Sequence, residues 1–434
     1  MSPEITGIVG IGLLLVLFLI RVQIAFAMAI VGFIGILYLA GIEPALTLLA
    51  QDIYESFTSY PLSVIPMFVV MGSFAFASGI SKRLYDTTYT WVGHLRGGLT
   101  IATVLACSSF AAICGSTVAT AATMGKIALP VMRKHGYDDT LATGTIAAAG
   151  TLGILIPPST VLVVYGILVE ESIGKLFIAG VLPGVLLSLF FVAVVVLICL
   201  KNPHYGPPGA PSSWKAKIKA TSGIIEAVIL FLLAIGGLFL GWFSPTQAGS
   251  IGAGGALVIG LIRRQHTWQR FFEAAKDGLR TSCMVLFILF GAVVFGHFLA
   301  LSDIPFLLAE WVGSLPISRM AIMGIIIFIY FVGGFFMDSM ALIVVTIPIF
   351  YPLVMKLGFD PIWFGVIVVL TGEMGVISPP VGVNVFVIKG IAPDIPLEVI
   401  FRGIIPFLVA LMIFTVILTI FPQIATFLPS LVSY

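Results

Sequence analysis

The chain has 434 residues, of which 60% are hydrophobic and only 9% are charged. Soluble domains contain about 25% charged residues, and a folded soluble protein needs a polar exterior that this composition cannot provide. A cytosolic enzyme, a disordered chain and a nucleic-acid-binding protein are therefore excluded, and a multi-pass membrane protein is expected. The formal net charge is only +2, so the position of each charge is more informative than the total.

Ten apolar runs have the length of a membrane-spanning helix, which needs about 20 residues. They cover about 3–20, 22–40, 62–80, 139–169, 175–200, 221–242, 246–262, 279–300, 361–390 and 402–428. Two further runs, 97–135 and 317–356, are too long for one helix and contain Gly, Ser or Asp near the middle. We predict that each forms a re-entrant helical hairpin; two full spans each would be the alternative.

Amphipathic, charged segments lie between these runs, and they are typical of helices at a membrane surface. They cover 41–60, 81–96, 263–280 and 301–316. We expect them to act as arms between two parts of the protein, a static group of helices (the scaffold) and a group that moves relative to it (the transport unit). Ordinary loops would also fit.

The basic residues predict the orientation, because cytoplasmic segments are enriched in Lys and Arg. With the N-terminus outside, all but three of the 21 basic residues lie on the cytoplasmic side, the exceptions being Lys175, Arg319 and Lys356. Both termini are then periplasmic, the first hairpin enters from the cytoplasm and the second enters from outside.

The two halves of the chain resemble each other. A shift of 222 residues overlays 129–158 on 351–380 without a gap and aligns Pro157-Pro158 with Pro379-Pro380. The polar segment 202–220 is the predicted cytoplasmic linker between the repeats 1–201 and 221–434. Because each repeat holds five spans, an odd number, the second is inverted relative to the first, as in many secondary transporters.

Within each repeat, scaffold helices precede a transport unit made of a hairpin and a broken helix. The scaffold helices are predicted at 1–60 and 221–262. The transport units combine hairpin 97–135 with broken helix 139–169, and hairpin 317–356 with broken helix 361–390.

The double prolines should break the long helices near the membrane centre, because proline lacks an N–H donor and clashes with the preceding turn. Exposed carbonyl oxygens there suit a cation, and the N-terminus of the following half-helix suits an anion. At the hairpin tips the 222 shift aligns Ser116 with Asp338 and Thr117 with Ser339.

Two intramembrane acids each leave two interpretations. Asp338 is either a cation ligand or a helix cap, and Glu373 either assists cation or proton binding or makes a structural hydrogen bond. Glu226 is expected to extend toward the cytoplasmic surface. His297 is expected to be a packing histidine with a satisfied ring, with a proton carrier as the alternative. No phosphate-binding loop, zinc-binding H-E-x-x-H motif or G-x-S-x-G nucleophile motif is present, so neither an enzyme nor an ATP-driven pump is expected.

Four segments around the hairpin tips and the double prolines are distinctive: CGSTVATAATMGKIALPVMRKHGYD (114–138), GTLGILIPPS (150–159), MDSMALIVVTIPIFYPLVMKLGFDP (337–361) and GEMGVISPPVGVNVFVI (372–388). Through these segments the sequence resembles the large membrane subunit of tripartite ATP-independent periplasmic (TRAP) transporters, in the wider ion-transporter superfamily. The resemblance implies an all-α inner-membrane protein that moves by an elevator mechanism. It also implies two partners, a small four-helix membrane subunit and a periplasmic substrate-binding protein.

The resemblance further implies Na⁺ sites between each hairpin tip and the adjacent broken helix. In the first half the matching residues are Gly115, Ser116, Gly150, Thr151 and Pro157. In the second half they are Gly334, Asp338, Ser339, Gly372, Ser378 and Pro379. The substrate is expected to contact Thr117, Pro158, Ser159, Glu373, Pro380 and Asn384.

We therefore expect Na⁺-coupled uptake of a small organic anion, a carboxylate or a sulfonate. A stand-alone Na⁺- or H⁺-coupled symporter of the same architecture is the main alternative. A channel fits less well, because the sequence offers isolated acids rather than a continuous polar pathway.

Overall fold

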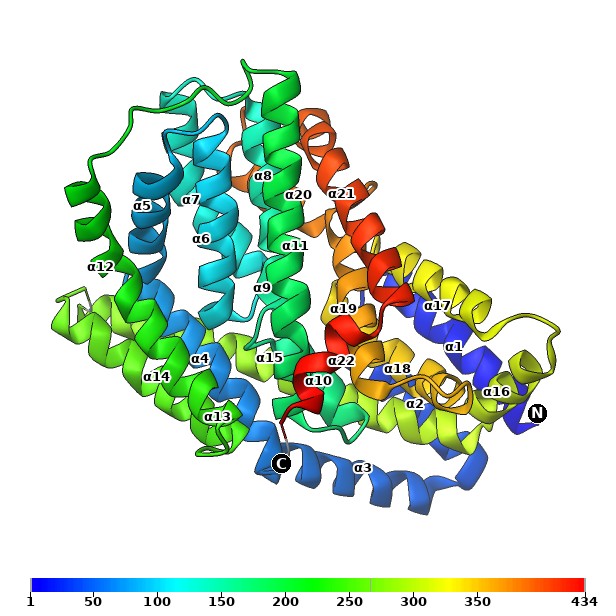
Figure 1. Cartoon of the computed structure of the whole chain (residues 1–434). Helices are drawn as coiled ribbons and strands as arrows, with labels where there is room; N and C mark the ends of the chain where they lie inside the picture. The colour runs from blue at the N-terminus through cyan, green and yellow to red at the C-terminus, as the bar shows by residue number, and fades with distance from the viewer. Residues whose placement is uncertain (1, 266, 433–434) are drawn as a thin grey trace.

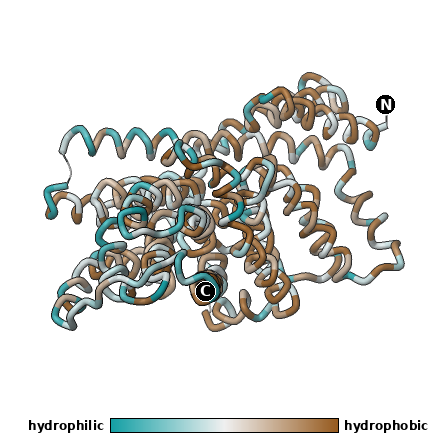
Figure 2. The backbone as a smooth tube through the Cα atoms, turned by 90° about the horizontal axis from the view of Figure 1, so that it is seen from above, coloured by the Kyte–Doolittle hydropathy of each residue, from teal (hydrophilic) through white to brown (hydrophobic). Residues whose placement is uncertain are grey.

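The structure is a computed structural model that describes residues 2–265 and 267–432, and over these residues it contains helices and no strands. The predicted all-α fold is confirmed. Large apolar side chains are exposed on the outer helices, among them Ile8, Leu19 and Leu197. Hydrophobic residues, drawn in brown in Figure 2, run along long stretches of the helices. Such an exterior suits lipid rather than water.

The helices of the first half follow the predicted order. They are α1 (Pro3–Leu19), α2 (Ile24–Ala40), α3 (Ile42–Thr58), α4 (Val64–Ala77), α5 (Ile80–Val92), α6 (Gly98–Cys114), α7 (Thr117–Lys134), α8 (Asp139–Gly150), α9 (Leu152–Leu155), α10 (Thr160–Leu168) and α11 (Ile173–Lys201), with a 3-10 turn at Pro61–Ser63.

The second half repeats this order. Its helices are α12 (Trp214–Phe231), α13 (Gly237–Phe239), α14 (Pro245–Ile262), α15 (Trp268–Leu301), α16 (Ile304–Ser314), α17 (Arg319–Gly333), α18 (Ser339–Lys356), α19 (Pro361–Ile377), α20 (Val383–Ile391), α21 (Leu397–Ile420) and α22 (Gln423–Ser430), with a π turn at Leu232–Gly236. Helix α12 starts inside the segment 202–220, so part of the predicted linker is helical.

Six of the described helices are long and apolar enough to cross a bilayer, and two bent helix pairs raise this number to eight. Helices α1, α2 and α19 are apolar but only 17 residues long. The number of ten spans therefore remains a prediction.

Two groups of helices are visible in the fold. Helices α2, α4, α14 and α15 pack against one another, and helices α6 to α9, α11, α19, α20 and α21 form a second packed body. In Figure 1 the lime-coloured α14 and α15 cross below the upright α6, α8 and α11. The first group is defined here as the scaffold, and the second group together with α10, α17 and α18 as the hairpin body.

Two predicted boundaries were wrong. The segment 263–280 and the span 279–300 were expected as separate elements, but α15 is one helix of 34 residues. No proline interrupts residues 268–301, so the backbone hydrogen bonds continue. The run 402–428 was expected as one span, but α21 ends at Ile420 and α22 begins after Pro422.

Glu226 on α12 was expected to extend toward the cytoplasmic surface, but its carboxylate is instead paired with two arginines. Its carboxylate accepts a 2.6 Å hydrogen bond from Arg83 of α5 and also pairs with Arg263, which directly follows α14. The side chain of Glu226 is 13% exposed. This carboxylate therefore ties α5 to two helices of the second half.

His297 on α15 was expected to be a packing histidine with a satisfied ring, and the structure gives it a hydrogen-bond partner. Its Nδ1 lies 3.1 Å from Oδ2 of Asp52 on α3, and Asp52 is buried. The pair therefore attaches α3 to α15.

A second ion-pair cluster joins the two halves at the end of α7. Arg133 pairs with Asp139 of α8 at 2.8 Å and with Asp394, in the loop after α20, at 2.6 Å. The guanidinium group of Arg133 lowers the pKa of Asp394 below its usual value. A depressed carboxyl pKa means that this pair stabilises the fold at neutral pH, and that the contribution is lost as pH falls through the lowered pKa.

We predict that Asp394→Asn lowers the thermal stability at pH 7 and that the difference from the wild type shrinks as the pH falls toward about 3, below the ordinary Asp value. Thermal unfolding of purified protein at several pH values measures this. A difference that stays constant down to acidic pH would contradict the assigned role of the ion pair.

Candidate substrate and cation site

Each hairpin reverses direction at a short non-helical tip. In the first, Gly115 has a φ of +64°, a left-handed conformation that ends a helix and favours glycine. Ser116 then caps α7, its Oγ accepting from the Ala119 N–H at 3.3 Å. In the second, Asp338 caps α18 and accepts from the Ala341 N–H at 3.0 Å. The residues aligned by the 222 shift thus occupy equivalent positions, and the helix-cap interpretation of Asp338 holds in this structure.

Each broken helix is interrupted at its double proline. The helical segments before and after Pro157-Pro158 are bent by 41°, and α19 ends at Ile377 before Pro379-Pro380. Because prolines lack an N–H, the carbonyls of Gly153 and Ile154 have no amide donor four residues ahead. Carbonyl oxygens of this kind are hard ligands for a cation.

The hairpin tips lie directly against these breaks. Thr160 Oγ1 donates to the Gly115 carbonyl at 3.0 Å. A Cβ placed on Gly153 would lie 2.5 Å from the Ser116 carbonyl oxygen, and one placed on Gly334 would lie 2.8 Å from the Gly372 carbonyl oxygen. Glycine is therefore required for the backbone of each tip to approach its broken helix.

Glu373 contacts both hairpin tips. One carboxylate oxygen, Oε2, accepts from Thr117 Oγ1 at 2.6 Å, and the other, Oε1, accepts from Ser339 Oγ at 2.6 Å. Its side chain is buried, at 2% exposure. The equivalent residue of the first half, Thr151, instead donates to the Ala148 carbonyl of its own helix. The 222 shift aligns Thr117 with Ser339, but the sequence repeat alone does not predict that they share a partner.

Several other predicted site residues hydrogen-bond to backbone groups in this conformation. Ser159 is fully buried and caps α10, and Ser378 donates to the Met374 carbonyl. Asn384 is fully buried, and its Nδ2 donates to the Ala147 carbonyl of α8 at 3.0 Å. The Asn384 Oδ1 has no hydrogen-bond partner among the described residues.

A cavity of about 1090 Å³ separates the hairpin tips from the scaffold. This volume is near the upper end of the usual range for small-molecule sites, about 300–1,000 Å³. On the tip side it is lined by Ser116, Thr117, Asp338, Ser339 and Glu373. On the scaffold side it is lined by residues of α2, α4 and α15, including Ile24, Gly72, Ser73, Phe76, Met284 and Ile288. Pro158, Ser159, Pro380 and Asn384 do not line it, so the cavity brings together only two of the six residues predicted for the substrate, Thr117 and Glu373.

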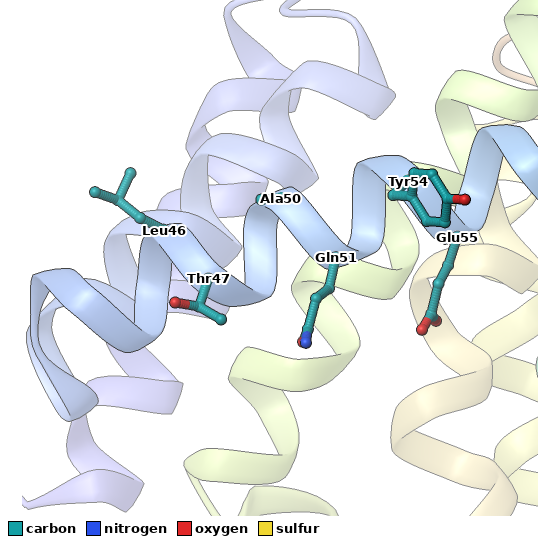
Figure 3. Close-up of a pocket in the computed structure, with 6 residues that line it drawn as sticks. All are labelled: Leu46, Thr47, Ala50, Gln51, Tyr54 and Glu55. Carbon is teal, nitrogen blue, oxygen red and sulfur yellow. The ribbon is translucent and has the colours of Figure 1, made fainter.

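A second hollow, of about 540 Å³, lies on α3, away from the hairpin tips. Its six lining residues, from Leu46 to Glu55, all come from this one helix (Figure 3). Because no second element contributes a side chain, this hollow lacks the converging polar groups of a substrate site.

Comparison with known proteins identifies the family. Residues 11–424 match the family model described as "Tripartite ATP-independent periplasmic transporter, DctM component". The chain belongs to this family. It is therefore the large permease subunit of a TRAP-type transporter, a multi-pass membrane protein and not an enzyme.

Named relatives agree with this assignment. The C4-dicarboxylate TRAP transporter large permease protein of Pseudomonas aeruginosa is 37% identical over 368 residues, which are 84% of this permease and 85% of the relative. The isethionate TRAP transporter permease protein DctMQ of Oleidesulfovibrio alaskensis is 34% identical over 84% of this permease and 57% of the relative. The solved YdaH transporter of Alcanivorax borkumensis has a similar fold, with a TM-score of 0.66 at 17% identity over 88% of this permease and 90% of that chain.

Proposed function

We propose that this TRAP permease carries out Na⁺-coupled uptake of a small organic anion, a carboxylate or a sulfonate. The observation that supports this most directly is the pair of equivalent hairpin tips, each held against a broken helix, whose polar residues line one cavity. Paired broken helices of this kind supply carbonyl ligands for a cation and helix N-termini for an anion.

For the cation, each tip-and-break junction offers oxygen ligands of the type that a hard cation prefers. In the first half the candidates are Gly115, Ser116, Gly150, Thr151 and Pro157. In the second half they are Gly334, Asp338, Ser339, Gly372, Ser378 and Pro379. Helix capping by Asp338 is compatible with this role, because a carboxylate has about four lone-pair sites and can accept from the Ala341 N–H while it also ligates a cation.

For the anion, the relatives supply the chemical class. The Pseudomonas relative is named for C4-dicarboxylates and the Oleidesulfovibrio relative for isethionate, so a carboxylate or a sulfonate is a reasonable cargo. Thr117 and Ser339 line the cavity together with two cations, Lys126 and Arg270, and two acids of α15, Glu273 and Asp277. Among these groups, the Lys126 ammonium and the Arg270 guanidinium would donate charge-assisted hydrogen bonds to an anion.

The cavity position also suggests how the solute crosses. Its walls belong to the scaffold on one side and to the hairpin body on the other, so sliding of the hairpin body would open the site alternately to each face, as in an elevator. With the orientation predicted from the basic residues, Lys126 and Arg270 mark the cytoplasmic side. The structure would then represent the inward-facing state in the inner membrane, with both termini periplasmic.

Two partner subunits complete this proposal, a periplasmic substrate-binding protein that delivers the anion and a small four-helix membrane subunit. The isethionate relative is considerably longer than the matched region, which would accommodate a fused small subunit.

Counterflow in proteoliposomes with a panel of dicarboxylates and isethionate tests the proposal, with Na⁺ replaced by K⁺ in parallel. We expect exchange that requires Na⁺, and we expect Ser116→Ala and Asp338→Asn each to raise the Na⁺ concentration needed for half-maximal exchange. Exchange that is unaffected by removal of Na⁺ would rule out the coupling. Uptake by this chain alone, without a binding protein or a small subunit, would instead favour the stand-alone symporter.

A further inference from the structure

The carboxylate of Glu373 contacts the two hairpin tips in an almost symmetrical way. Thr117 and Ser339 are each the first residue of the returning helix of a hairpin, α7 and α18. Both hydroxyl groups donate to Glu373 over the same distance, 2.6 Å, but to different oxygens of the carboxylate. Among the described residues, no other side chain hydrogen-bonds to both tips.

The geometry points to Glu373 as a positioning residue that couples the conformations of the two hairpin tips. Hydrogen bonds to a charged acceptor are stronger than neutral ones, particularly where water is excluded. The carboxylate is buried, and its two bonds join residues 117 and 339, which are far apart in sequence and belong to opposite repeats. If one tip moves, the carboxylate loses one bond and is no longer held in place for the other tip.

The surrounding residues favour this geometry. Gly372 leaves space for the Ser339 side chain, since a Cβ there would lie 3.0 Å from Ser339 Oγ. The N-cap bonds of Ser116 and Asp338 fix the first turn of each returning helix, and therefore the position of each hydroxyl. The two tips thus present preorganised donors to one acceptor.

This inference rests on the proposed function only in that the tips border the substrate and cation sites. Coupled tips would make the two candidate Na⁺ sites cooperative, because binding at one tip would fix Glu373 for the other. The structural part of the inference, that a change at one tip alters the other, holds or fails independently of Na⁺ coupling.

Hydrogen exchange of the full-length protein in detergent measures the structural part. We expect Ser339→Ala to increase amide exchange at residues 117–120 of the opposite hairpin by about tenfold, the effect of losing roughly one hydrogen bond to a charged group. Thr117→Val should likewise increase exchange at residues 339–342. In a Glu373→Gln background each substitution should add little, because the connection is already weakened, so the double-mutant cycle is non-additive.

Thr371→Val is the matched control, because Thr371 is also buried on α19 but donates only to the Ile367 carbonyl of its own helix. It should leave exchange at both tips unchanged. Additive effects, or an effect confined to the mutated tip, would overturn the coupling even if all variants stay folded.

The Na⁺ dependence of counterflow tests the functional consequence. The wild type should show a sigmoidal dependence on Na⁺, and Glu373→Gln should reduce its Hill coefficient toward 1. A wild-type Hill coefficient of 1, or one unchanged in Glu373→Gln, would overturn cooperativity through Glu373. A complete lack of Na⁺ dependence in the wild type would contradict the proposed function, while the exchange experiment would still decide whether the tips are coupled.

Discussion

Replacing Gly153 with valine should strongly reduce transport while the protein still inserts into the membrane. A Cβ at this position would lie 2.5 Å from the Ser116 carbonyl oxygen and 2.8 Å from Thr120 Oγ1. The first of these atoms belongs to the backbone of the hairpin tip, so the clash cannot be relieved by rotating a side chain. The tip must separate from the broken helix, which removes the contact on which the first candidate cation site depends.

We expect the initial rate of counterflow to fall at least about tenfold, because overpacking of a tight contact typically costs roughly 1–3 kcal/mol. The rate should be normalised to the amount of reconstituted protein. Gly254→Val is the control, since Gly254 lies within α14 and a Cβ there has no neighbour within 4 Å. Near-normal transport by Gly153→Val would show that the close approach of tip and break is not needed.

Replacing Glu226 with alanine should produce the largest loss of stability among the charge substitutions. The carboxylate pairs with Arg83 and Arg263, and removing it leaves two nearby guanidinium groups without their shared acceptor. Breaking a buried ion pair costs about 3–5 kcal/mol. Because Arg83 and Arg263 are 23% and 49% exposed, solvent screening reduces the expected cost to roughly 1–3 kcal/mol.

Thermal unfolding in detergent, followed by fluorescence, measures this loss as a lower midpoint temperature. Glu310→Ala provides the comparison, because Glu310 is an exposed acid on α16 with no ion pair among the described residues. An exposed substitution of this kind changes stability by less than about 0.5 kcal/mol. Equal midpoints for the two variants would mean that Glu226 does not stabilise the packing of α5 against α12 and α14.

The positions of the helices could be predicted largely from local patterns. The hairpin tips coincide with the Gly, Ser and Asp residues that interrupt two long apolar runs, and the breaks coincide with the double prolines. The surface segments 41–60, 81–96 and 301–316 correspond to α3, α5 and α16. These features depend on residues that are close together in the sequence, which is why a single sequence was sufficient.

The tertiary partners of the polar residues could not be predicted in this way. Glu226 meets Arg83 across 143 residues, and Glu373 meets Thr117 across 256 residues. Asn384 reaches the Ala147 carbonyl of the opposite repeat, so this residue supports a broken helix in addition to its predicted role at the substrate site. The continuous helix α15 was predicted as two elements, 263–280 and 279–300, because the sequence pattern changes there from amphipathic to apolar although the helical backbone continues.

The shared carboxylate of Glu373 has a consequence for how such a chain could have originated. In a dimer of identical half-length chains, the two halves would carry the same residue at this position, so the assembly would hold either no glutamate or two. A single continuous chain allows one repeat to keep Thr151 while the other carries Glu373. Gene duplication followed by fusion therefore allows a single central acid, which an assembly of two identical halves cannot have.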